Sequence, residues 1–571
     1  MDVKKYIETN WIEIISVFSI FLLALILRII VITNYGDIVL DELYTFYFAS
    51  RESIFDTVKE LTLQDVHTPL YFILLHIWIK IFGSTPNAMR YCSLFFSIAL
   101  IPLSYYYMKN NFNRMSGYFA SIMLSINTLC AFYCIQIRFY SLLMPLTLIT
   151  AFSFVSLLEK FDKKRAVIFI LAHTLLIYTF TLSLVMSVFY AFTGLAYLVL
   201  KKKNIKEFAL TYLISGILAI PAGIFTIYNS IVMSKNFCRH SLEFFDFSWL
   251  AIYDMLENFF SSENYQLINR GVALYRNMFD NLEDLKYVFL VFIPVLICLF
   301  GFFRSLFSKN SKLYLLALPS ILTIITVFIL CASSVMYYQT KYLLIVYPII
   351  ICICAYGLSK IKNMVISIFI FSVFAYLNMM YCLLIPNNLY NYHAFEITGN
   401  INYGLNSNVK VNDDDILFCP YISEKMKLLI DKGNMIPFAF DEGLLLKNKE
   451  ALKYYFSEEQ LKKLTGENIK SKLIDDFENN IISETFEKNL YNDYIKNMKP
   501  NQKFIILAPY TYITGDLNKP SRINKENYKK VTRFEFLMSK VSKDAMQTAK
   551  KYLIYDGYYI GNDYGIYVFK K

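Results

Sequence analysis

Long apolar runs alternate with short charged segments along the chain as far as residue 385, where the runs stop. Most runs are close to the roughly 20 residues that a transmembrane helix needs. The first run, residues 11–32, lacks a small-residue cleavage site, so we expect a retained helix rather than a signal peptide. Arg28, near the outer end of this helix, is expected to snorkel to the membrane interface. The pattern predicts a mainly α, polytopic helical membrane protein.

Basic clusters set the expected orientation, because loops rich in lysine and arginine stay in the cytoplasm. Three apolar stretches separate Lys4 and Lys5 from the next cluster, Lys109 and Arg114, and three crossings would leave that cluster outside. The shortest stretch, residues 69–82, is therefore interpreted as an amphipathic helix on the outer membrane surface. About eleven spans remain, with the N-terminus in the cytoplasm. They are expected at residues 11–32, 88–108, 115–134, 139–158, 166–180, 184–200, 208–232, 287–303, 313–332, 342–358 and 364–385.

Two long segments are expected outside the membrane, at residues 33–87 and 233–284, and the second should also contain a surface helix. Beyond residue 385, charges of both signs are dense and no apolar run is long enough to span. Short apolar strands are predicted there at residues 415–419, 503–508 and 565–569, with helices at 423–431 and 457–464. We therefore expect a transmembrane domain over residues 1–385 and a small extracytoplasmic α/β domain over residues 386–571.

Composition supports the membrane assignment and narrows the classes of partner. Of the 571 residues, 56% are hydrophobic and 18% are charged, whereas soluble domains are about 45–50% apolar and about 25% charged. The net charge of +11 mostly reflects cytoplasmic loops, so it does not indicate nucleic-acid binding. The ten cysteines show neither the spacing of a zinc site nor that of a disulfide framework.

An acidic pair, Asp41 and Glu42, follows the first apolar run. A carboxylate pair at the mouth of a membrane span is costly to dehydrate, and such residues are candidates for a functional site. The alternative is a solvated, acidic outer loop without chemistry.

Other polar residues are expected at the same outer face: His67, Arg90, Arg138 with Tyr140, and Lys341 with Tyr342. Basic residues are disfavoured outside, so the three cations need an anionic partner, which is either the acidic pair or a phosphate. The alternatives are simpler. Arg90 and Lys341 could snorkel at helix ends, Arg138 could pair with an acid of the first outer segment, His67 could be a turn residue, and Tyr140 could be an interfacial aromatic.

Taken together, these residues fit the transfer of a group from a phosphate. Arginine and lysine stabilise the charge that develops on a phosphate leaving group, and a positioned aspartate can accept the proton of an acceptor hydroxyl or amine. With the site outside a membrane, the donor would be a lipid carrier that exposes its headgroup there.

The same motifs resemble those of the GT-C glycosyltransferases, above all the dolichyl-phosphate-mannose–protein mannosyltransferases and their bacterial relatives, including the aminoarabinose transferase of lipid A. Two departures from the family pattern are Thr68, in place of a proline, and Lys341, in place of an arginine, which offers a point charge without bidentate geometry. The matching residues are Asp41-Glu42, His67-Thr68-Pro69-Leu70, Gly83 with Arg90, Gln136-Ile137-Arg138-Phe139-Tyr140, and Lys341-Tyr342 before Pro348.

The resemblance implies a GT-C fold and an inverting transfer of a sugar from a polyprenyl monophosphate, expected to be undecaprenyl-based, in a bacterial plasma membrane. Asp41 would be the general base, and Glu42 would orient it or the acceptor. The substrate-binding residues would be His67, Arg90, Arg138, Tyr140, Lys341 and Tyr342, with the three cations on the donor phosphate. Relatives that use monophosphate donors generally need no metal, although Asp41 and Glu42 could hold a divalent cation. The acceptor, a glycan, lipid or protein, stays open.

Two other classes of membrane protein compete with the transferase. A transporter or flippase of lipid-linked saccharides should show internal repeats and broken helices at matched positions, and the sequence shows neither. A polysaccharide polymerase usually carries paired arginine-rich outer loops, whereas the first outer loop here is acidic.

Overall fold

The computed structural model describes residues 3–34, 40–64, 67–236, 250–260, 282–333, 339–393, 415–419, 434–437, 490–509, 545–560 and 564–571. The chain divides into two compact units. The first comprises Met1–Phe237 and Phe245–Asn388, and the second comprises Cys238–Phe244 and Leu389–Lys571.

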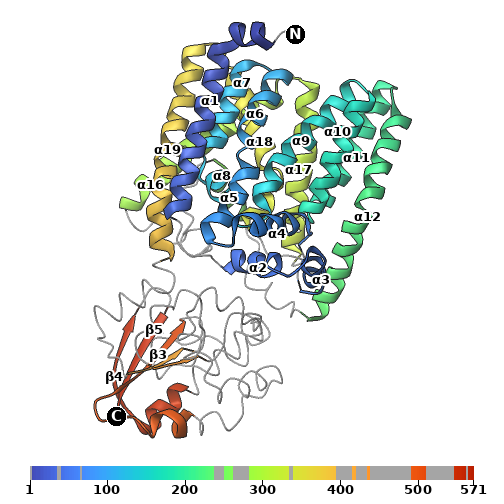
Figure 1. The fold of residues 1–571 in the computed structure, drawn as a ribbon. Helices are drawn as coiled ribbons and strands as arrows, with labels where there is room; N and C mark the ends of the chain where they lie inside the picture. The colour runs from blue at the N-terminus through green and yellow to red at the C-terminus, as the bar shows by residue number, and fades with distance from the viewer. Residues whose placement is uncertain are drawn as a thin grey trace. The chain divides into compact units, whose positions relative to one another are not determined.

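The first unit is a bundle of long helices (Figure 1). Every segment that we expected to span the membrane contains a helix, and the second, third and tenth segments each contain two. Six described segments are long and apolar enough to cross a membrane, and shorter apolar helices accompany them. The prediction of a polytopic helical membrane protein is therefore confirmed. The helices are α1 (Val3–Asn34), α5 (Pro86–Ser97), α6 (Leu100–Asn111), α7 (Arg114–Ile126), α8 (Thr128–Tyr133), α9 (Tyr140–Glu159), α10 (Lys163–Thr179), α11 (Ser183–Lys201), α12 (Ile205–Asn236), α16 (Leu282–Leu306), α17 (Ser311–Ala332), η2 (Thr340–Ile345), α18 (Tyr347–Ser359) and α19 (Met364–His393).

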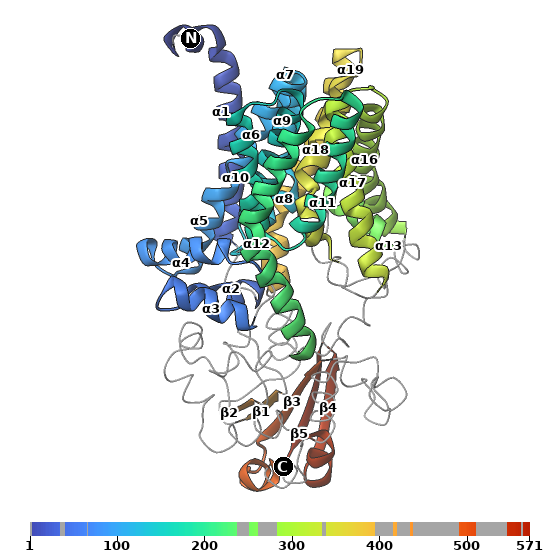
Figure 2. The same cartoon turned by 90° about the vertical axis from the view of Figure 1, so that its right-hand side faces the viewer.

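Three short helices lie across one end of this bundle rather than along it, as both views show (Figures 1 and 2). They are α2 (Leu40–Ala49), α3 (Ile54–Gln64) and α4 (Leu70–Phe82), and α4 is the segment predicted to be a surface helix. Phe48, Leu61 and Phe72, one from each helix, form a small buried core against Phe225 of α12. The expected helix of the second outer segment is α13 (Leu250–Phe260), which packs against α8, α16 and η2.

A break between α7 and α8 leads into the loop that carries Arg138. Asn127 has an extended backbone at the break, and its side chain accepts a hydrogen bond from the backbone N–H of Cys130 at 3.2 Å. Arg28 of α1 donates to the carbonyls of Leu124 and Ser125, at 3.0 and 3.2 Å. These carbonyls belong to the last turn of α7, where no further helical N–H groups are available to bond them. The prediction that Arg28 snorkels is wrong, because its side chain is fully buried.

Two glycines let α16 and α18 approach each other closely. A Cβ atom on Gly357 would collide with the carbonyl oxygen of Gly301, and the hydroxyl of Ser305 donates to the carbonyl of Ile353 at 2.5 Å beside this crossing. Small residues at helix crossings are typical of membrane bundles, where close packing replaces the hydrophobic effect.

The second unit contains a mixed sheet in the order β2-β1-β3-β5-β4. Strands β1 (Ile416–Cys419), β3 (Lys503–Pro509) and β5 (Tyr564–Lys570) confirm the three predicted strands, while β2 (Asn434–Pro437) and β4 (Ile554–Ile560) were not predicted. β1 runs parallel to β2 and β3, and β5 runs antiparallel to β3 and β4. The helices predicted at 423–431 and 457–464 lie outside the described residues.

Candidate active site

Helix α2 is fixed to α5 by a buried ion pair. The guanidinium of Arg90 donates to both carboxylate oxygens of Glu42, at 2.8 Å from Nη2 and 3.3 Å from Nε. The backbone N–H of Ile137 donates to the same carboxylate at 3.0 Å. Neither charged side chain is exposed to solvent. A buried carboxylate is tolerated only when its lone pairs are satisfied in this way, so Glu42 joins α2, α5 and the loop before α9.

Asp41 precedes Glu42 in α2, but its side chain lies outside the described part of the structure. Consecutive helical residues point about 100° apart, because a turn takes 3.6 residues. The bonds that hold Glu42 therefore also fix the backbone from which the Asp41 side chain leaves the helix.

The loop between α8 and α9 is held by hydroxyl groups. Ser93 of α5 donates to the carbonyl of Gln136 at 2.5 Å and accepts from the phenol of Tyr71 at 2.6 Å. One turn further along α5, Ser97 donates to the carbonyl of Cys134 at 2.8 Å. The backbone of this loop is therefore positioned by α4 and α5.

Arg138 and His67 belong to the same cluster. The guanidinium of Arg138 donates to the hydroxyl of Thr45 in α2 at 3.0 Å, and its side chain is 5% exposed. The imidazole of His67 lies 5.0 Å from the ring of Phe139, measured between centroids. Tyr140, at the start of α9, is buried, and its ring contacts that of Phe139 in a tilted arrangement with 4.3 Å between centroids. Together with the contacts of Glu42 to Arg90 and Ile137, these contacts bring together residues from four of the predicted motifs.

Lys341 and Tyr342 lie on the 3₁₀ helix η2, and both are half-buried. This helix packs against α9, which begins at Tyr140, and against α13 of the second outer segment. The late basic motif is therefore carried by an element that packs against α9, the helix that follows the Arg138 loop.

The residues that could hold a metal ion are few. Within the described segments no three His, Cys, Asp or Glu side chains form a group that could hold one. Glu42, half of the predicted acidic pair, already accepts hydrogen bonds from Arg90 and Ile137.

Sequence reasoning missed four residues that position the site: Thr45, Tyr71, Ser93 and Ser97. One signal was available. Arg90, Ser93 and Ser97 are spaced three and four residues apart in an otherwise apolar segment, which places them on one face of a helix. A polar stripe within a membrane bundle faces other protein rather than lipid.

The comparison with protein families finds one match. Residues 66–226 match the model of the family described as dolichyl-phosphate-mannose-protein mannosyltransferase. This segment contains four of the predicted site residues, His67, Arg90, Arg138 and Tyr140, and the match confirms the resemblance to the GT-C glycosyltransferases. No curated protein matches the chain in sequence.

Two solved structures show a distant similarity. One is ArnT from Cupriavidus metallidurans bound to undecaprenyl phosphate, with 10% identity, a TM-score of 0.45, and coverage of 98% of this chain and 98% of that one. The other is ArnT from the same organism in the apo state, with 12% identity, a TM-score of 0.45, and coverage of 88% and 94%. Both TM-scores are too low to establish a common fold.

Proposed function

We propose that this protein is a membrane glycosyltransferase that moves a sugar from a polyprenyl phosphate to an extracytoplasmic acceptor. One observation carries the proposal: contacts join the acidic pair's helix, the His67 segment, Arg90 and the Arg138 loop at one end of the bundle. The match of residues 66–226 to a mannosyltransferase family supports the reaction class. The distribution of basic clusters along the sequence favours the outer side of the membrane for this end.

In the proposed reaction, an acceptor oxygen or nitrogen attacks the anomeric carbon of the sugar. The bond between that carbon and the phosphate oxygen breaks, and the phosphate leaves with the electron pair. The proton of the acceptor passes to the carboxylate of Asp41, which acts as the general base. A single displacement of this kind inverts the anomeric centre.

The cations have different roles in this proposal. Arg90 donates to Glu42 with two nitrogens, which favours a positioning role for it: the ion pair holds α2 and therefore Asp41. Arg138 and Lys341 then stabilise the negative charge on the leaving phosphate, which is undecaprenyl-linked by the resemblance. His67 shapes the Arg138 loop through its contact with Phe139.

A lipid and glycan profile tests the reaction class. The sugars on envelope glycans, lipids and proteins are measured in cells with and without the gene product, to find the sugar that is lost when the protein is absent. We expect the wild-type chain to restore that sugar and Asp41→Asn to fail, although the variant protein accumulates in the membrane. The control is Glu52→Gln, which removes an exposed carboxylate in the same outer segment. Full restoration by Asp41→Asn would overturn the proposed role of Asp41, and an unchanged profile without the protein would overturn the function.

A further inference from the structure

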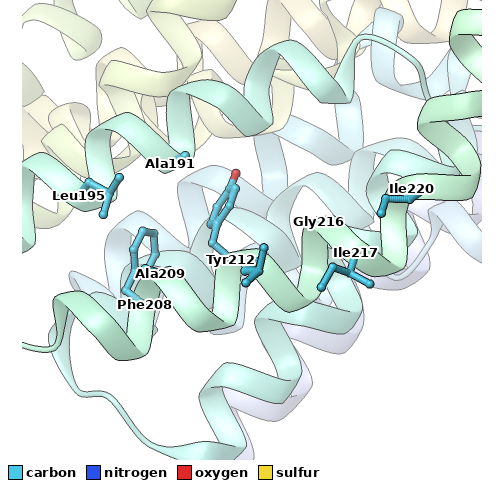
Figure 3. A pocket seen from close by; sticks show the side chains of 9 residues that line it. Ala191, Leu195, Phe208, Ala209, Tyr212, Gly216, Ile217 and Ile220 are labelled. Atoms are coloured by element: carbon cyan, nitrogen blue, oxygen red, sulfur yellow. The ribbon is translucent and has the colours of Figure 1, made fainter.

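A groove between α11 and α12 lies in a part of the bundle that the proposed reaction does not use (Figure 3). Its volume is about 490 Å³, and its walls include Leu195 of α11 and Ala209, Gly216 and Ile220 of α12. Neighbouring apolar side chains on both helices are exposed, such as Phe192 at 67%. In a polytopic membrane protein, such a surface faces lipid chains rather than water.

The groove stays apolar because the polar groups that line it or lie near it are bonded within the protein. The phenol of Tyr212 lies 2.8 Å from the hydroxyl of Ser187, and the imidazole of His173 lies 2.8 Å from the hydroxyl of Ser215. Gly216 keeps the middle of the groove open, since within the described part of the chain no atom lies within 4 Å of where its Cβ would be.

The dimensions fit one leaflet of a bilayer. From Ala209 to Ile220 the groove follows α12 for roughly 16 Å, at 1.5 Å per residue. The hydrocarbon core of a membrane is about 30 Å thick, so each leaflet contributes about half of that. One acyl chain can therefore lie along the groove.

A basic cluster stands at the end of the groove. α11 ends at Lys201 and α12 begins at Ile205, so a three-residue connection reverses the chain. Lys202, Lys203 and Lys206 are exposed there, and Glu207 is the only acid in the stretch from Lys201 to Ala209. Lys206 is three residues, or about 5 Å along the helix, from Ala209 at the groove wall.

We propose that the α11/α12 groove and these lysines bind an anionic phospholipid of the leaflet opposite the candidate active site. One acyl chain lies in the groove, and the headgroup phosphate lies against Lys202, Lys203 and Lys206. Basic residues of cytoplasmic loops are expected from the topology alone. Here the lysines lie at the end of an apolar groove whose length along α12 matches the thickness of one leaflet. This combination makes a specific site for a lipid headgroup and one of its acyl chains.

Native mass spectrometry of the full chain in detergent tests the site. Phosphatidylglycerol and phosphatidylcholine with identical acyl chains are added separately, and the lipid-bound fraction is measured. We expect phosphatidylglycerol to bind preferentially. The variant K202Q/K203Q/K206Q should lose that preference, with about a hundredfold fall in phosphatidylglycerol binding, since each lysine contributes about 1 kcal/mol. The control K163Q/K164Q, which neutralises the basic start of α10, should bind like the wild type.

A second pair of variants tests the groove itself. Gly216→Leu fills it and should abolish binding, whereas Gly223→Leu, on the same helix where a Cβ also meets no described atom, should not. Leucine is a better helix former than glycine, so both variants should fold. Ala209→Phe fills the lysine end of the groove independently. The proposal would be overturned if the wild type bound both lipids equally or if K163Q/K164Q lost as much binding as the triple variant. It would also be overturned if Gly216→Leu and Ala209→Phe both kept full binding.

Discussion

Arg90 holds Glu42 through two nitrogens, at 2.8 and 3.3 Å, and both side chains are completely buried. Because Glu42 also accepts from the backbone of Ile137, this one contact joins α2, α5 and the Arg138 loop. The pair therefore determines where the neighbouring Asp41 leaves α2.

Neutralising one member of this ion pair should destabilise the protein more than neutralising both members. Glu42→Gln removes the buried carboxylate that pairs with Arg90, and breaking one side of such a buried pair costs about 3–5 kcal/mol. The double variant Glu42→Gln/Arg90→Gln should recover part of that loss, because it removes both charges of the pair. Thermal unfolding in detergent measures both, with Glu52→Gln as the exposed control. Simple additivity of the two single losses would contradict the coupling.

Arg138 should act on the donor more than on the acceptor. Arg138→Ala removes a charge from the proposed phosphate contact, and charge-assisted hydrogen bonds are worth about 1.5–3 kcal/mol. We expect the KM for the lipid-linked donor to rise roughly tenfold or more, with a smaller change for the acceptor. Thr45→Val is the matched control, because it removes the hydrogen bond to Arg138 but keeps the charge. An equal effect on both substrates would indicate that Arg138 is merely structural.

The crossing of α16 and α18 should not tolerate a side chain. Gly357→Ala places a methyl group against the carbonyl of Gly301, and overpacking of this kind costs about 1–3 kcal/mol. Gly223→Ala, where a Cβ meets no described atom, should leave the melting temperature unchanged or slightly raised. Equal melting temperatures for the two variants would show that the helices separate easily.

Orientation can be measured directly. A reporter fused after Gly83, at the end of α4, should be active only outside the cytoplasm, because α4 is assigned to the outer surface. A reporter fused after Lys202 should be active only inside. Cytoplasmic activity after Gly83 would contradict the assignment of α4.

The sequence predicted the elements better than their contacts. Length and hydropathy locate the helices of the bundle, and the excess of apolar stretches between two basic clusters sets apart α4, which lies across one end of that bundle. The sequence predicted that Glu42, Arg90 and Arg138 lie at one membrane face, and their contacts bring them together at one end of the bundle. The partner of each charge depends on tertiary packing, so Arg90 reaching Glu42 could not be distinguished from Arg90 reaching a phosphate.

Arg28 shows most clearly that a sequence pattern does not predict the partner of a buried charge. Its place near a helix end suggests snorkelling, but the carbonyls exposed by the break after α7 offer it buried acceptors. That break is set by Asn127, whose role as a cap within an apolar run is weak in the sequence. The short strands β2 and β4 likewise lack a distinct alternating pattern and depend on their neighbours in the sheet.

The pool of sugar-loaded polyprenyl phosphate tests the proposed reaction most directly. It is measured by mass spectrometry of lipids from cells that make the wild type, Asp41→Asn or Glu52→Gln. If Asp41 accepts the proton in the transfer, the loaded lipid should accumulate in Asp41→Asn cells and stay at the wild-type level in Glu52→Gln cells. A loaded-lipid pool that is the same in all three strains would contradict transfer from a lipid phosphate at this site.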